Sequence, residues 1–207
     1  MLTDEIQPLL SNLSTPEAIQ TFLDSLPYVG EELNRSPLRV IRDRQCHCLD
    51  GALLAALALR QIGHPPRIID LVPEPNIDDD HVLAIFQVEG CFGAVAKSNF
   101  VGLRYREPVY RSLRELVMSY FDVFYNVDGL KTLRAYTRPL NLAAFDRFVW
   151  QTSEAGVEKI VKRLYSQKTI PVIEPGRVAG LSRMDKRSYE AGMLGLNFEG
   201  LFKKPGG

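Results

Sequence analysis

The sequence has no excess of either charge: its 207 residues contain 25 Lys and Arg and 25 Asp and Glu. A chain with no net charge has no global field to draw it to nucleic acid or to anionic lipid, and no local basic patch is evident in its place. We therefore expect neither a nucleic-acid nor a membrane partner. The sequence does not indicate an oligomeric state.

The sequence also lacks a long hydrophobic run. Its longest apolar stretch, Gly51–Leu59, is far shorter than the roughly 20 residues that a membrane-spanning helix needs. The first residues, Met1–Glu5, are acidic where a secretory signal would be basic, and no small-residue cleavage site follows an apolar stretch. We expect a cytoplasmic protein.

Cysteine is scarce, with only three residues. Cys46 and Cys48 are too close in the sequence for an ordinary structural disulfide, and an odd number leaves one thiol over. This usage favours reduced thiols with packing, metal-binding or catalytic roles.

Repeats, heptads and low-complexity tracts are absent, so the fold is read from local patterns. A helix is predicted from Pro16 to Leu26, a short one after Ser36, and a nearly all-apolar, hence central, one over 49–62. Strands are predicted over 67–72, 81–88 and 91–97, the last two joined by a tight turn at Glu89-Gly90. Together these elements predict an α+β fold in which a central helix packs on an antiparallel sheet.

The second half adds elements to that core. Helices are predicted after the capping residues Ser112, Asn141 and Ser153, and a strand over 132–138, while 102–108 is read as a loop. From Pro175 the apolar density falls and glycine breaks recur. We predict a single domain over residues 1–174, with its core at about 36–140, followed by a loosely packed tail over 175–207.

Cys48 occupies the predicted start of the central helix, where chemistry favours a thiolate. The unpaired amides and the dipole of a helix N-terminus stabilise an anion, and such positions can lower a cysteine pKa from about 8.5 to between roughly 3.5 and 7.5. A thiolate is the reactive nucleophile, and the same amides can hold an oxyanion. Cys48 is therefore a candidate nucleophile.

The spacing that begins at Cys48 resembles that of the transglutaminase-like superfamily of papain-type cysteine enzymes. The matching positions, which single out Cys48 rather than Cys46, are Cys48, Ala52, Leu59, Arg60, Gly63, Pro65 and Arg67. The resemblance covers about residues 46–96, a quarter of the chain. It implies a papain-type core in which His81, at the start of a strand, approaches the Cys48 thiol.

The resemblance is incomplete at the third catalytic position. Members of the superfamily usually carry a Gly-x-Trp turn followed by an Asp that orients the histidine. Here Gly90-Cys91-Phe92 supplies the turn, and the Asp position falls on Ala96. Ser98 or Asn99 could replace the Asp, since an Asn amide can hold a catalytic His. The following segment, 97–110, resembles that of a bacterial subgroup of the superfamily.

The resemblance implies an enzyme that cleaves or transfers an acyl group of a peptide, a protein or a small amide or ester. Cys48 would attack the carbonyl, and His81 would take its proton and later deliver it to the leaving group. Hydrolysis is favoured over transfer because water is always available, and no cofactor is required. The alternative, motivated by Ala96, is a transglutaminase-like domain that has lost catalysis and serves as a binding or scaffolding protein.

Plainer interpretations stay open beside these. Cysteine is among the most often buried residue types, and a histidine after three aspartates is commonly a solvated turn residue, so Cys48 and His81 could be structural. The aspartates 78–80 are expected to form a solvent-facing loop. A zinc site is a further reading, disfavoured by the spacing of its candidate ligands. Those candidates are Cys46, His47, Cys48, His81 and Cys91.

Overall fold

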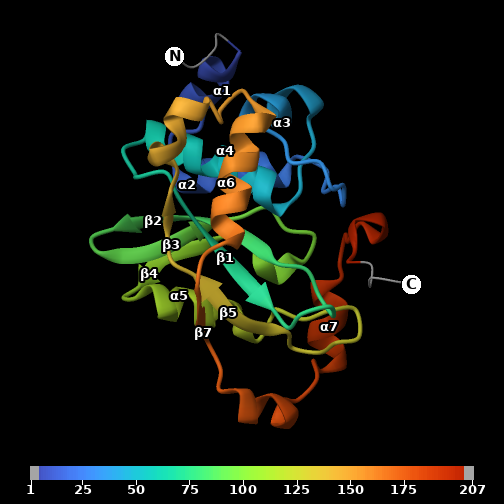
Figure 1. Ribbon diagram of the computed structural model, residues 1–207. Coiled ribbons are helices and arrows are strands. Elements are labelled where there is room, and N and C mark those ends of the chain that lie inside the picture. The colour runs from blue at the N-terminus through green and yellow to red at the C-terminus, as the bar shows by residue number, and fades with distance from the viewer. Residues whose placement is uncertain (1–4, 203–207) are drawn as a thin grey trace.

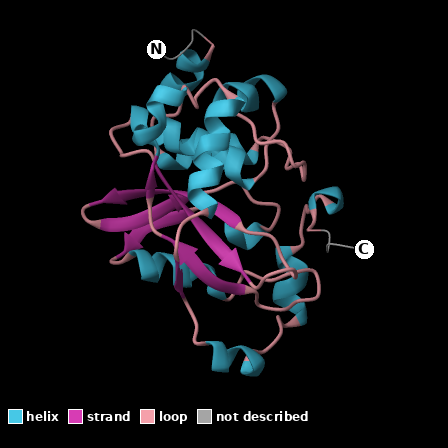
Figure 2. Ribbon diagram, viewed as in Figure 1, coloured by secondary structure: helices cyan, strands magenta, loops and turns pink. Residues whose placement is uncertain are grey.

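The computed structural model describes residues 5–202, which form a mixed α and β structure with an antiparallel sheet (Figures 1 and 2). The α-helices are α1 (Ile6–Asn12), α2 (Pro16–Asp24), α3 (Pro37–Asp43), α4 (Cys48–Gln61), α5 (Leu113–Phe121), α6 (Glu154–Tyr165) and α7 (Lys186–Gly192). The strands are β1 (Arg67–Pro73), β2 (His81–Val88), β3 (Cys91–Val95), β4 (Arg106–Tyr110), β5 (Leu133–Thr137), β6 (Leu140–Asn141) and β7 (Thr169–Pro171). Short 3₁₀ helices are η1 (Val101–Leu103), η2 (Leu142–Phe148), η3 (Pro175–Gly180) and η4 (Phe198–Gly200).

Hydroxyl caps begin several helices where the sequence predicts them. The side chains of Thr15, Ser36, Ser112 and Ser153 each accept a hydrogen bond from a first-turn backbone amide of α2, α3, α5 and α6. These bonds satisfy donors that a helix N-terminus leaves unpaired, and such a cap stabilises a helix by about 1 kcal/mol. The predicted starts of these four helices are confirmed.

The sheet has the order β4-β3-β2-β1-β5-β7, with antiparallel pairing throughout, and β6 pairs with β1 off this path. Its centre is the predicted hairpin β2–β3 and the predicted strand β1. The two edge strands, β4 and β7, each contain a proline, Pro108 and Pro171. The segment 102–108, which was expected to be a loop, instead contributes the start of β4.

The sheet is covered on both faces, so the molecule has two cores. Figure 1 shows α1–α4 and α6 on one side of the sheet and α5 on the other. On β2, Val82, Ala84 and Phe86 pack into the core that contains α4, whereas Leu83 and Ile85 pack into the core that contains α5. Successive strand residues point to opposite faces, and this alternation decides which side chains can reach the start of α4.

The central helix α4 is buried nearly throughout, as its composition predicts. At Gly51 it approaches the segment that follows β3 so closely that a β-carbon there would overlap the β-carbon of Lys97. The buried Lys97 ammonium donates to the carbonyl oxygens of Leu23 (2.9 Å) and Leu26. Glycine at position 51 thus lets the helix N-terminus lie directly against the segment that leaves β3.

The final segment lies mostly at the surface, and Leu196 is its buried residue within 175–202. It contains η3, α7 and η4, and Asn197 forms hydrogen bonds with two earlier parts of the chain. The predicted helix after Asn141 is the 3₁₀ helix η2, so its position is confirmed but its type differs. Within residues 5–202, no helix is both long enough and apolar enough to cross a membrane.

Candidate functional site

Cys48 is the first residue of α4, as predicted, and its side chain is partly exposed. It lies in a cleft whose walls include Tyr28, Asp79, Asp80 and Tyr165. The Cys48 sulfur is 3.9 Å from the backbone carbonyl oxygen of Asp80. The thiol therefore faces the residues that lead into β2.

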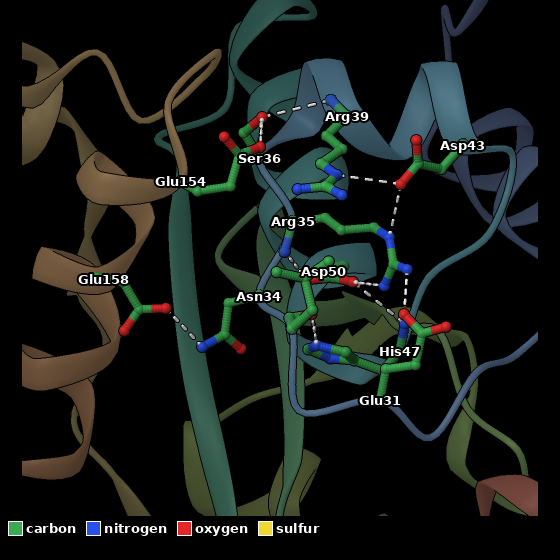
Figure 3. Close-up of polar contacts among 11 residues, drawn as sticks. Glu31, Asn34, Arg35, Ser36, Arg39, Asp43, His47, Asp50, Glu154 and Glu158 are labelled. Carbon is green, nitrogen blue, oxygen red and sulfur yellow. Dashed lines mark hydrogen bonds and ion pairs between the residues drawn. The ribbon is translucent and has the colours of Figure 1, made fainter.

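A buried ionic network fixes the start of α4 (Figure 3). Asp50 is fully buried and accepts bonds from the backbone amides of Arg35 (2.7 Å) and His47 (3.4 Å) and from the Arg35 guanidinium (3.5 Å). The same guanidinium, only 2% exposed, also binds Asp43 (3.1 Å) and Glu31. The network ties the chain before α3 to the first turn of α4, and so positions Cys48.

His47 joins this network at the start of α4. Its Nε2 atom lies 3.1 Å from the carbonyl oxygen of Leu33 and 3.2 Å from an Asp50 carboxylate oxygen. Both contacts engage the Nε2 atom of His47, which also lines the cleft. The His47 side chain therefore holds the 31–36 segment against the helix start.

The structure does not bring His81 to Cys48. His81 has the same strand parity as Leu83 and Ile85, so its ring lies on the α5 face of the sheet, whereas Cys48 lies on the α4 face. The ring is buried, and its Nε2 donates a 2.7 Å hydrogen bond to the carbonyl oxygen of Leu103. Burial lowers the pKa of His81 to about 4, which keeps the imidazole neutral at pH 7.

Ser98 and Asn99 line a second cavity together with His81, but their hydrogen bonds go elsewhere. The Ser98 hydroxyl accepts from the backbone amide of Phe100 (3.0 Å). The Asn99 side chain donates to the backbone carbonyl oxygen of Asn197 and accepts from the backbone amide of Asn197, both at 2.8 Å. In this structure Asn99 is thus a docking residue for the C-terminal segment.

Asp80, one residue before the predicted histidine, is the residue that faces the thiol. Because it is two residues before Val82, its side chain points to the same face of the sheet as that of Val82. Its carboxyl group adjoins that of Asp70 on the neighbouring strand β1. Asp70 is 2% exposed. One oxygen of each group, Asp70 Oδ1 and Asp80 Oδ2, is buried and has no hydrogen-bond partner. Burial and the Asp80 charge raise the pKa of Asp70 well above its usual value.

These carboxyl groups oppose ionisation of the thiol. Burial, followed by the nearby charge of Asp80, raises the pKa of Cys48 well above its usual value, although the backbone amide of Val82 acts in the opposite direction. A helix N-terminus stabilises an anion by typically 0.3–1 kcal/mol, which is small beside the cost of a second negative charge in a buried site. Cys48 is therefore a protonated thiol at neutral pH.

The cleft has an acidic and aromatic lining. Besides Asp79 and Asp80, it includes Glu31 and Glu32, and Glu31 is already paired with Arg35. Among the described residues, no lysine or arginine lines it. Residues 200–202 of the C-terminal segment close one side of this cleft and also line the cavity beside His81.

The other candidate ligands are dispersed. Cys46 is buried in the α4 core, and burial raises its thiol pKa to about 12, while Cys91 lies at the β2–β3 hairpin. Within the part of the chain that the structure describes, no three His, Cys, Asp or Glu side chains come together in a group that could hold a metal ion.

Sequence reasoning missed Asp70, Tyr165 and Arg35. A signal existed for Asp70, because it is the one charged residue inside the apolar run Ile68–Val72. Asp78 and Asp80 also differ from the expected solvent-facing loop: both are partly buried, and Asp78 accepts a hydrogen bond from the Thr132 hydroxyl. No family model and no curated protein matches the sequence.

Proposed function

We propose that this protein is a binding domain with a transglutaminase-like arrangement of helix and strands, in which Cys48 is not a thiolate nucleophile. The observation that carries the proposal is that the Cys48 thiol contacts the backbone carbonyl of Asp80, the residue before β2, and that Val82, two residues on, lies in the core that contains α4. His81 is on the opposite face and is bonded to Leu103.

A cysteine nucleophile needs a neighbouring base or cation that favours its thiolate. Here the groups beside the thiol are carboxyls, whose charge disfavours a second anion, and the neutral His81 ring is separated from it by the sheet. The cleft itself is well built, since the Arg35 network fixes its inner wall. A preformed cleft without an activated nucleophile supports ligand binding rather than acyl transfer.

The cysteine-enzyme alternative keeps one supporting observation: Cys48 is a partly exposed thiol at a helix N-terminus inside a cleft. In that alternative Cys48 would attack an amide or ester carbonyl, with hydrolysis favoured over transfer. It requires a base on the α4 face of the sheet. His81 would supply that base only if β2 slipped by one residue, which would invert the face of every side chain on the strand.

Thiol alkylation by iodoacetamide, followed at each cysteine by mass spectrometry between pH 5 and 9.5, separates the two functions. For a binding domain we expect Cys48 to react slowly below pH 8 and faster as pH rises, with no selective reaction over Cys91. We expect His81→Ala to leave this profile unchanged. Asp80→Asn, which removes the nearest carboxylate, should increase the Cys48 rate severalfold at pH 8.

Two controls accompany this measurement. His64→Ala removes a histidine at the turn after α4 and should match the wild type, and thermal unfolding confirms that each variant is folded. The proposal is overturned if wild-type Cys48 reacts selectively below pH 7 and loses that reactivity in His81→Ala, because that result would require a thiolate–imidazolium pair.

A further inference from the structure

The carboxyl groups behind the Cys48 thiol lack a positive partner. Asp70 is nine-tenths buried or more, and Oδ1 of Asp70 and Oδ2 of Asp80 have no hydrogen-bond donor. Buried polar atoms are nearly always paired, because each unpaired one costs about 1–3 kcal/mol. Burial raises the pKa of the Asp70 carboxyl well above its usual value, which favours a proton on that group.

That proton can be replaced by a cationic group, and the surroundings favour an organic one. Tyr28 and Tyr165 flank the cleft, and aromatic rings attract ammonium and guanidinium groups. Glu32 adds an acidic group to the lining, and no described lysine or arginine lines the cleft to compete. A metal ion is less well served, since the described residues provide no set of three suitable ligands.

We propose that this cleft binds the positively charged group of an organic ligand, an alkylammonium or a guanidinium, between Tyr28 and Tyr165 and against Asp80 with Asp70 behind it. This inference rests on the proposed binding function and names its ligand class. As the cation enters, the proton of the Asp70 carboxyl leaves to solvent, so the net charge of the site is unchanged. The other titratable groups that face the pair are Cys48, Asp79, Tyr28 and Tyr165.

Isothermal titration calorimetry on the full chain tests this inference with cadaverine and agmatine as probes. The first carries only ammonium groups, and the second carries both a guanidinium and an ammonium. The uncharged 1,5-pentanediol is the matched control, and calcium chloride tests for a metal site. We expect one or both organic cations to bind in the millimolar range or tighter at pH 7.5 and low salt, with proton release seen in buffers of different ionisation enthalpy.

Variants locate the binding. Asp80→Asn should weaken it at least tenfold, whereas Glu107→Gln, the same loss of charge on the exposed edge strand β4, should leave it unchanged. Tyr165→Leu should weaken it severalfold; its side chain is 55% exposed, so this variant tests the cleft even if Asp80→Asn fails to fold.

The inference is overturned if neither cation binds, if pentanediol binds as well as cadaverine, or if Tyr165→Leu binds normally. Calcium binding tighter than either organic cation would also overturn it. These outcomes are separate from thiol reactivity: absent cation binding with a slowly reacting Cys48 removes only the ligand class, whereas a fast Cys48–His81 pair removes the proposed function itself.

Discussion

The buried guanidinium of Arg35 provides the sharpest test of how the cleft is held. In Arg35→Met the apolar stem is kept and the charge is lost, so Asp50, which is 0% exposed, retains only backbone amides and His47 as partners. Removing one partner of a buried ion pair costs about 3–5 kcal/mol, because the remaining charge stays buried. For a domain of this size we expect a Tm lower by about 6–20 °C.

Arg39→Met is the matched control. Arg39 binds the same Asp43 at 3.2 Å, but its side chain is 43% exposed against 2% for Arg35. Exposed pairs contribute about 0–1 kcal/mol, so this variant should change the free energy of unfolding by less than about 1 kcal/mol. Urea unfolding, followed by the fluorescence of the single, buried Trp150, measures both variants.

The effect of Arg35→Met should also depend on pH. Burial already raises the pKa of Asp50 above its usual value, and loss of the guanidinium raises it further. A raised carboxyl pKa costs stability above the unfolded value of about 4, and protonation removes that cost as pH falls. The difference between Arg35→Met and wild type should therefore be largest near pH 7–8 and shrink toward pH 4. Equal, small losses in Arg35→Met and Arg39→Met at pH 7 would refute this account of the network.

Two further variants test the approach of α4 to the sheet and the docking of the C-terminal segment. Gly51→Ala should destabilise the fold by about 1–3 kcal/mol, because its methyl group would overlap Lys97 even though alanine is the better helix former. The control Gly176→Ala has open space around it and should change stability by less than about 0.5 kcal/mol. Equal urea midpoints for the two variants would contradict the close contact. Asn99→Ala removes two hydrogen bonds to Asn197, worth about 1–3 kcal/mol together, and should speed amide exchange of residues 197–200 about tenfold or more. Asn34→Ala, which loses an exposed bond to Glu158, is its control, and unchanged exchange in Asn99→Ala would show that the segment is held by other contacts.

Most elements were predictable from the sequence because their signals are local. The capping hydroxyls, the apolar run of α4 and the turn at Glu89-Gly90 each act within a few residues. Strand β4 was missed because it places two charged residues, Arg106 and Glu107, directly before Pro108, which an edge strand tolerates but a loop also favours. The 3₁₀ type of η2 was not predictable, because a 3₁₀ helix differs from an α-helix only in bonding three residues back rather than four, and residue types do not specify that difference.

The site was harder to predict than the fold because it depends on the face of β2. All residues from His81 to Phe86 are buried, so no polar face distinguishes odd from even positions. A shift of one residue in the pairing of β2 decides whether Asp80 or His81 lies beside Cys48. Neither composition nor spacing fixes that choice. The partner of Asp80 was equally hidden, since Asp70 and Asp80 meet only through the pairing of β1 with β2.

The prolines of the two edge strands bear on how copies of the protein meet. An exposed strand edge offers free amides and carbonyls that can template pairing with another chain, and proline removes a donor from that edge. Pro108 lies within β4, and Pro171 ends the three-residue β7. Growth of the sheet from one molecule into the next is therefore disfavoured at both ends, a safeguard against aggregation for a sheet whose central strands are so uniformly apolar.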